Sequence, residues 1–199
     1  MALSFDMKDF PLFGRPVRAT PRLFMAVGDL PARDFSDRRP TPGVAYAPWD
    51  EDDIEPAAAL IAEAYAGHID ATINDQYRSQ EGARRFLVNT TDHTGCGVFL
   101  RRASVTARRG VFRALAGVCL ASRVDADAGH ITQICVAPGE RGRGVGREML
   151  RRTLDVLAGQ AIELASLTVT ETNTGAIALY RGLGFETWRR FHAFVWEGA

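Results

Sequence analysis

Apolar residues recur every three to four positions in two long segments of the chain. They are Leu60, Ile61 and Ala64 in the first segment, and Leu150, Leu154 and Leu157 in the second. This spacing places the apolar side chains on one face of a helix, so each segment predicts an amphipathic helix. The first helix follows acidic residues at 50–53, which suit a helix N-terminus. A shorter helix is predicted over 82–88, with its apolar residues turned inward.

Shorter runs rich in β-branched residues predict strands. These runs lie at 44–47, 97–101, 117–122, 130–136, 167–170, 185–188 and 191–196. With the helices, and one more that ends at Gly184, they give the order β-α-α-β-β-β-α-β-α-β-β. This order predicts an α/β fold, in which helices cover the faces of a mixed sheet.

Residues 1–43 differ from the rest of the chain in their proline content. The prolines are Pro11, Pro16, Pro21, Pro31, Pro40 and Pro42. Prolines at this density prevent long helices. We therefore expect an N-terminal extension and linker over residues 1–43, ordered in part at best, and a folded domain over residues 44–199.

A glycine-rich turn follows the strand predicted at 130–136 and leads directly into a helix. Its glycines are Gly142, Gly144 and Gly146, and its arginines are Arg141, Arg143 and Arg147. Glycines at alternate positions let backbone N–H groups converge, and a helix N-terminus offers unpaired donors to an anion. The turn therefore predicts a phosphate-binding site, with a solvated basic connection as the alternative. Neither a dinucleotide fingerprint nor a P-loop fits, because Arg147 replaces the third glycine and the P-loop lysine is missing.

A second informative segment runs from the strand at 167–170 to Phe185. Asn173 suits a helix N-cap, and Gly184 suits the position that ends the helix. Tyr180 lies seven residues after Asn173, so both side chains occupy one face, about two turns apart. A core aromatic residue with a bonded hydroxyl is the alternative interpretation of Tyr180.

The two segments together resemble the GNAT superfamily, the acetyl-CoA-dependent N-acetyltransferases. Arg141-x-x-Gly144-x-Gly146 is similar to the pyrophosphate motif of that family. The residues that match its second motif are Asn173, Ala176, Leu179, Tyr180, Gly184 and Phe185. The resemblance covers about residues 44 to 197. It implies a mixed, mostly antiparallel central sheet of about seven strands flanked by four helices.

The resemblance also implies roles for individual residues. The opened strand at Ile134, Cys135 and Val136 would pair with the pantetheine arm of acetyl-CoA, and the backbone N–H near Val136 would donate to the thioester carbonyl. Asn173 would bind the pantetheine, and Tyr180 would protonate the leaving thiolate. The pyrophosphate site would comprise Arg141, Gly142, Arg143, Gly144, Val145, Gly146 and Arg147.

The general base is less clearly indicated by the sequence. Thr168 occupies the position where ribosomal-protein N-acetyltransferases of this superfamily have a glutamate. His130 lies near the position at which histone acetyltransferases have one, and imidazole can accept a proton near neutral pH. A solvent-facing histidine is the alternative for His130. Other candidates for the base are Glu171, His68 and His93.

Composition narrows the function further. Lys and Arg total 24, as do Asp and Glu, so no overall charge favours nucleic acid or an anionic membrane. No apolar run is long enough to span a membrane. Cys96, Cys119 and Cys135 form no C-x-x-C pair, which favours reduced thiols in a cytoplasmic protein. The scattered histidines show no metal-ligand spacing, so no metal site is expected.

The predicted function is transfer of an acetyl group from acetyl-CoA to a primary amine, either on a small molecule or on a peptide. The acceptor is expected at 68–78, where Asp70 and Asp75 would attract a cationic amine, although a solvated polar loop is an equal alternative. An acyl-CoA-binding module without catalysis is the second hypothesis, and a nucleotide-phosphate-binding protein of another fold is the third. A homodimer through the last strands stays open, and Trp188 and Trp196 would suit its interface.

Overall fold

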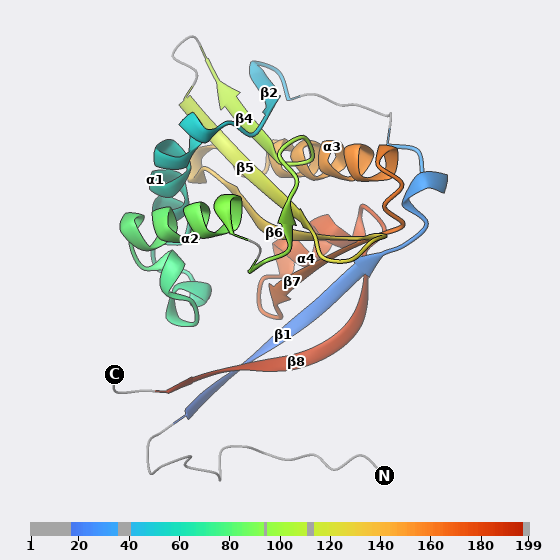
Figure 1. Ribbon diagram of the computed structural model, residues 1–199. Helices are drawn as coiled ribbons and strands as arrows, with labels where there is room; N and C mark the ends of the chain where they lie inside the picture. Colours follow the sequence, from blue (N-terminus) through green and yellow to red (C-terminus); the bar gives the residue numbers. More distant parts are fainter. Residues whose placement is uncertain (1–16, 36–40, 94, 111–113, 197–199) are drawn as a thin grey trace, which may run out of the picture.

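A computed structural model describes residues 17–35, 41–93, 95–110 and 114–196 (Figure 1). An eight-stranded sheet has the order β2-β4-β5-β6-β7-β1-β8, and β3 pairs with β5. In chain order the strands are β1 (Val17–Val27), β2 (Val44–Pro48), β3 (Val98–Phe99), β4 (Val105–Arg109), β5 (Ala114–Arg123), β6 (Ala128–Val136), β7 (Leu164–Thr170) and β8 (Glu186–Trp196). Only β6 and β7 pair in parallel, so the sheet is mixed and mostly antiparallel, as predicted.

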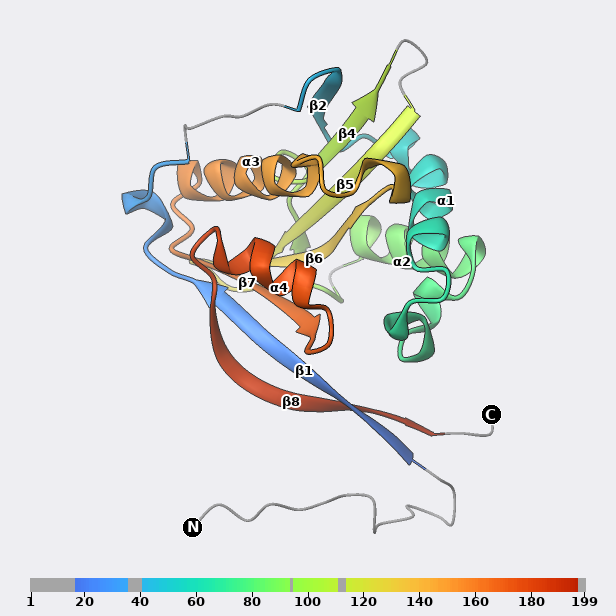
Figure 2. The same cartoon turned by 180° about the vertical axis from the view of Figure 1, so that it is seen from behind.

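Helices cover both faces of this sheet (Figures 1 and 2). They are α1 (Ile54–Ala64), α2 (Gln80–Asp92), α3 (Val145–Gly159) and α4 (Thr174–Arg181). The side chains of Ile61 and Leu87 pack with β5 on one face, in the core under α1 and α2. On the other face, Leu150, Leu154 and Leu157 of α3 are fully buried, as the helical spacing predicted. Each such leucine contributes about 1.5–3 kcal/mol through burial.

The strand β1 lies within residues 1–43, where the sequence predicted an extension. It pairs antiparallel with β7 from Arg22 to Val27 and with β8 along its length. Alternate side chains at Leu23, Met25 and Val27 are buried in the core, and this burial outweighs the local proline content. Pro21 has no N–H to donate, but it lies just outside the β1–β7 pairing, which begins at Arg22. Its carbonyl oxygen still accepts from the N–H of Glu171, just beyond β7, so the sheet tolerates the proline.

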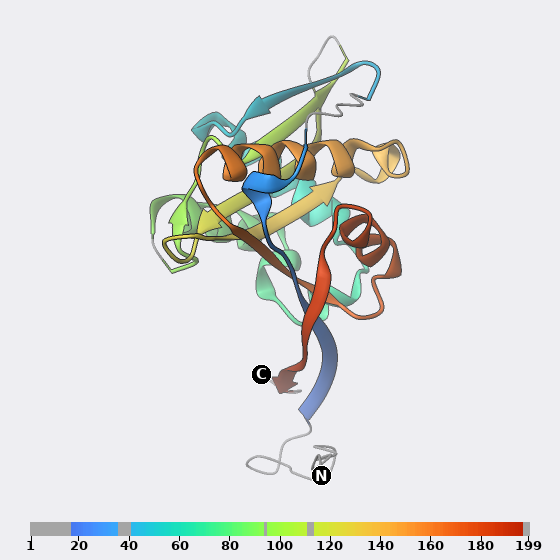
Figure 3. The same cartoon turned by 90° about the vertical axis from the view of Figure 1, so that its right-hand side faces the viewer.

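Three other predicted elements differ from the structure. No strand was predicted between 101 and 117, but residues 105–109 form β4, in which Val105, Thr106 and Ala107 are buried. The strand expected at 97–101 shortens to β3. The closing pair expected at 185–188 and 191–196 is the single strand β8, which continues past the end of β7 with β1 as a two-stranded ribbon (Figure 3).

The split between β6 and β7 positions the site. The two strands pair only from Ala128 to Ile131, opposite Leu164 to Leu167. The register of β6 against β5 shifts between Gln133 and Ile131, so a bulge lies where β6 leaves β7. Among the described strands, none therefore pairs with the backbone of β6 beyond Ile131 on its β7 side. In the part of the chain that the structure describes, no helix combines the length and apolar content needed to cross a membrane.

Candidate active site

A cleft of about 540 Å³ opens beside the free end of β6. Its walls come from the end of β6, the glycine-rich turn, α4 and the segment after α1. The lining residues that the sequence predicted are Ile134, Cys135, Val136, Arg141, Gly142, Gly144, Val145, Gly146, Arg147, Asn173 and Tyr180. Ala64, Tyr65 and His68 complete the wall opposite α4. The fold thus brings both motifs to one cavity.

The glycine-rich turn presents the N-terminus of α3 to this cleft. Gly142 and Gly144 have φ angles of 73° and 85°, which L-residues with a side chain rarely adopt. Gly144 is the N-cap of α3. A Cβ on Gly146 would lie 3.3 Å from Val136 Cγ2, so α3 and β6 approach closely here. The first N–H groups of α3 have no partners within the helix and favour an anion at this end.

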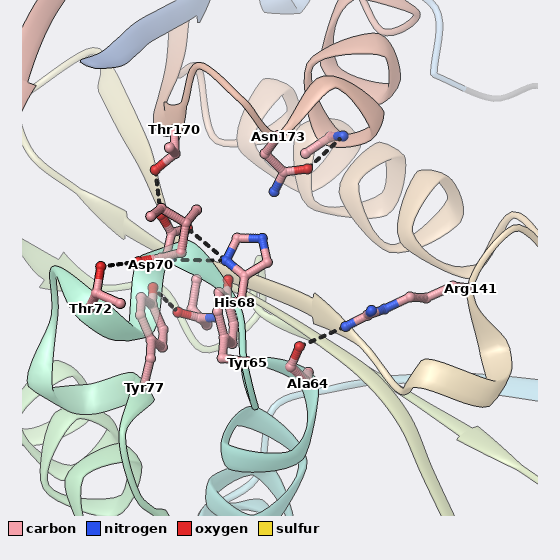
Figure 4. A network of polar contacts seen from close by, with 12 residues as sticks. Ala64, Tyr65, His68, Asp70, Thr72, Tyr77, Arg141, Thr170 and Asn173 are labelled. Carbon is pink, nitrogen blue, oxygen red and sulfur yellow. Dashed lines mark hydrogen bonds and ion pairs between the residues drawn. The ribbon is translucent and has the colours of Figure 1, made fainter. Parts of the chain in front are cut away.

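The arginines of the turn occupy different places. Arg147 lines the cleft. Arg141 also lines it, but its Nη2 donates to the carbonyl oxygen of Ala64 at 2.7 Å, at the end of α1 (Figure 4). Arg143 lines a neighbouring cavity of about 900 Å³ instead, and its carbonyl oxygen accepts from Thr41 Oγ1 at 3.2 Å. Arg141 and Arg147 thus lie on the side of the turn that faces the cleft, whereas Arg143 lines the cavity beside it.

Asn173 and Tyr180 face the cleft from α4. The Oδ1 atom of Asn173 accepts from Ala176 N–H at 3.2 Å, which is the N-cap predicted from the sequence. Tyr180 is 6% exposed, and its hydroxyl forms no hydrogen bond with any residue that the structure describes. Burial raises the pKa of Tyr180 well above its usual value, so the phenol is protonated at neutral pH and can donate.

A smaller cavity of about 100 Å³ lies in the split between β6 and β7. Five residues line both this cavity and the cleft, namely Tyr65, Ile134, Asn173, Ala176 and Tyr180. Tyr180 therefore lies where the two spaces meet. Arg22, Asp70, Tyr77, Gln133 and Thr168 are among the residues that line only the smaller cavity. A ligand in the cleft and another in the split would meet beside the Tyr180 side chain.

A polar network forms one side of the smaller cavity. The rings of Tyr65 and Tyr77 stack, with centroids 3.9 Å apart. The hydroxyl of Tyr77 donates to Gln133 Oε1 at 2.9 Å, and Gln133 Nε2 donates to the Tyr65 hydroxyl at 3.3 Å. Burial, followed by the charge of Asp70, raises the pKa of Tyr77 to about 12. Burial also raises the pKa of Tyr65, so both phenols are protonated at physiological pH.

The segment after α1 carries Asp70 and His68 to the same region (Figure 4). Asp70 is 6% exposed, and Thr170 Oγ1 donates to its Oδ1. His68 Nδ1 accepts from Asp70 N–H at 3.1 Å and lies 3.7 Å from Asp70 Oδ2. An Nδ1 that accepts assigns the proton of the neutral imidazole to Nε2. Asp70, which the sequence offered for attracting an amine, is thus a cavity wall, whereas Asp75 pairs with Arg78 at the surface.

The histidine that the sequence favoured as a base lies elsewhere. His130 Nδ1 is 2.9 Å from Ser166 Oγ, and its ring stacks on Phe24. It lines neither cavity, and burial lowers its pKa. Of the other candidates, His93 is exposed at the end of α2, and Glu171 pairs with Arg190 at 2.5 Å. The structure brings His68, not His130, to the cleft that Tyr180 lines.

Two further expectations concern cysteines and metals. Cys135 lines the cleft but is buried, and burial raises its pKa to about 12, so its thiol is not poised as a nucleophile. Among the described residues, His, Cys, Asp and Glu form no group of three that could hold a metal ion.

The sequence analysis did not identify four residues of the smaller cavity and its surrounding network. They are Arg22, Tyr65, Gln133 and Thr170, which come from segments far apart in the sequence, and no motif links them.

The sequence matches the acetyltransferase (GNAT) family over residues 24–185. A mycothiol acetyltransferase from Clavibacter sepedonicus is 30% identical over 151 residues, which are 76% of this chain and 45% of that protein. The N-alpha-acetyltransferase RimI of Mycobacterium tuberculosis is 35% identical over 77 residues, which are 39% of this chain and 47% of that protein. The matched regions thus cover less than half of these curated relatives.

The fold agrees with this match. A GCN5-related N-acetyltransferase from Sphaerobacter thermophilus has a similar structure, with a TM-score of 0.63 at 20% sequence identity. The similarity covers 89% of this chain and 51% of that one. The family match extends from β1 to the end of α4 and includes both motifs of the cleft. The chain therefore belongs to the GNAT family of acetyltransferases, which are acyltransferase enzymes.

Proposed function

We propose that this protein transfers the acetyl group of acetyl-CoA to a primary amine by direct attack of the amine on the thioester. The observation that carries the proposal is the position of Tyr180, where the cleft beside the α3 N-terminus meets the cavity in the strand split. One space suits the CoA ester and the other suits the acceptor. The relatives named as acetyltransferases support the same reaction class.

The cleft fits the chemistry of CoA at both ends. The N–H groups at the start of α3, with Arg147 beside them, suit a pyrophosphate. The backbone of β6 from Ile134 to Val136 has no partner strand on its β7 side, so it can pair with the amides of pantetheine as with an added strand. The side-chain amide of Asn173 borders the same path.

In the reaction, the lone pair of the amine nitrogen forms a C–N bond with the thioester carbon, and the C–S bond breaks. The Tyr180 hydroxyl donates its proton to the departing sulfur, and the phenol regains a proton from solvent. Backbone N–H groups of β6 near Val136 stabilise the oxyanion. The nitrogen loses its own proton to solvent, on the side of the cavity that the Asp70 carboxylate lines. We assign no part of this step to His130, which lies outside both cavities.

The test measures binding and turnover separately. Isothermal titration with acetyl-CoA should show one site at micromolar affinity, and the substitution Gly144→Glu should abolish it. Thiol release should then appear with a primary amine and not with its N-acetylated form. Absence of acetyl-CoA binding at high micromolar concentration would refute the proposal. Binding without turnover of any amine would favour a silent acyl-CoA-binding module.

We also propose a cytoplasmic location, supported by the free cysteines Cys96, Cys119 and Cys135. A homodimer is a further proposal, supported by the edge position of β8 and by Trp188, which is 59% exposed on that strand. Light scattering at several concentrations tests it, and a constant monomer mass would contradict it.

A further inference from the structure

The acceptor cavity contains two charged groups of opposite sign. Asp70 and Arg22 line it from different elements, η5 (Ile69–Thr72) and β1. Thr170 lies next to both residues. It is the cross-strand partner of Arg22 between β1 and β7, and its hydroxyl donates a hydrogen bond to the Asp70 carboxylate. Cross-strand partners have Cβ atoms about 4.5–5.5 Å apart, so the guanidinium and the carboxylate belong to one cavity.

The two charged groups form no ion pair with each other in the ranges that the structure describes. In the described part of the chain, Arg22 forms no ion pair, and its buried Nε atom has no hydrogen-bond partner. Asp70 is 6% exposed, and among the described residues its one partner within ion-pair distance is His68, at 3.7 Å. A buried polar atom without a partner is costly, as is a buried carboxylate with no arginine or lysine bound to it, so a ligand that carries both opposite charges would stabilise both side chains.

The size of the cavity limits what can enter. At about 100 Å³ the cavity is small beside the neighbouring cleft of about 540 Å³. The space admits an amine and one small group beside it, but not several residues of a peptide. The anionic group that meets Arg22 must therefore lie close to the reacting amine.

Resting on the function proposed above, we infer that the acceptor is a free amino acid. Its ammonium group binds Asp70, and its carboxylate binds Arg22. The guanidinium binds a carboxylate through two parallel hydrogen bonds, which fixes the orientation as well as the affinity. The side chain of the amino acid points to the open side of the cavity, and the amine faces Tyr180.

Matched amines test this inference. Thiol release from acetyl-CoA is measured with alanine, alaninamide and ethylamine, and with leucine, leucinamide and isoamylamine. Each kcat/KM is divided by the fraction of unprotonated amine, because the amides are weaker bases than the acids. The free acids should exceed their amides and decarboxylated amines by about 10- to 100-fold, since the amides leave Arg22 without its anion.

Two variants separate the roles. Arg22→Leu should lower kcat/KM for alanine by about 10- to 100-fold and change the value for alaninamide less than threefold. Arg18→Leu is the matched control, because Arg18 is exposed on the same strand and lines neither cavity; it should change neither value. Asp70→Asn keeps the side-chain size and should lower kcat/KM for acids and amides alike. Acetyl-CoA titration of each variant shows that the cleft is intact.

Each outcome decides the question. Amides or simple amines that react as well as the acids would overturn the inference and leave the acetyltransferase function standing. Equal loss for acid and amide in Arg22→Leu would overturn the role of Arg22. Binding of acetyl-CoA without turnover of any amine in the panel would overturn a free amino acid as acceptor. Failure to bind acetyl-CoA would remove the proposed function itself.

Discussion

Replacing Tyr180 with phenylalanine removes one oxygen atom at the junction of the two cavities. The hydroxyl has no hydrogen-bond partner among the described residues, whereas the ring is buried beside Phe185, with centroids 6.0 Å apart. The ring packing survives the substitution and no hydrogen bond is lost. We therefore expect the free energy of unfolding to change by less than about 0.5 kcal/mol.

The effect on catalysis should be much larger. Loss of a positioned general acid lowers turnover by about 10²- to 10⁴-fold, equivalent to about 2.7–5.4 kcal/mol in the barrier. Thiol release under saturating acetyl-CoA measures kcat, and titration of acetyl-CoA measures binding, which should change less than threefold. Because burial raises the pKa of Tyr180, the wild-type rate should show no loss from its ionisation below about pH 10.

The control is Tyr46→Phe. Tyr46 lies on β2, lines neither cavity and donates to Thr41 Oγ1 at 3.0 Å, so the variant loses a hydrogen bond worth about 1 kcal/mol, while Thr41 keeps its own bond to the Arg143 carbonyl oxygen. It should be slightly less stable and fully active. Turnover of Tyr180→Phe within threefold of wild type, with acetyl-CoA bound normally, would refute the acid role.

Three further predictions follow from the same geometry. Gly144→Glu should weaken acetyl-CoA binding at least 100-fold in titration, because its φ of 85° strains any side chain and the carboxylate meets the phosphate site; unchanged affinity would contradict that placement. His130→Gln should keep turnover within twofold. In the wild type the free energy of unfolding should fall as the pH drops below about 6.5, and this fall should be smaller in His130→Gln. The sign follows because burial lowers the folded-state pKa of His130 below 6.5, so the unfolded chain binds the proton first; an identical pH dependence in urea unfolding would argue against it. Glu148→Leu should lower the free energy of unfolding by about 3–5 kcal/mol in the same assay, since Glu148 is 2% exposed and pairs with Arg151 and Arg152; a stabler variant would show that apolar packing outweighs the pair.

The position of the two motifs at one cleft was predictable in part because each motif is local in sequence. The turn from Arg141 to Arg147 and the helix from Asn173 to Tyr180 each carry their own signal in glycine spacing, capping and helical periodicity. The structure brings both segments to the predicted cleft. The exception is Arg143, because sequence spacing does not reveal which side of a turn a side chain occupies.

The lining of the smaller cavity was not predictable because it is assembled from distant segments. Arg22 and Thr170 become neighbours only through the pairing of β1 with β7, and Gln133 joins Tyr65 and Tyr77 only through tertiary packing. The proline content concealed β1 itself, although the alternation of Leu23, Met25 and Val27 was present in the sequence. An alternation over only three apolar residues is weak evidence for a strand, and the prolines argued against one. The segment forms a strand because it pairs with β7 and β8, which are distant in the sequence.

The position of β1 has a consequence for biosynthesis. Among the described strands, the first to leave the ribosome ends between β7 and β8, the last two to be made. Such contacts have a high sequence separation, which slows folding because loop closure precedes any gain from pairing. During translation the apolar side chains of β1 lack their partner strand until β7 emerges, and such unpaired strands are prone to aggregate.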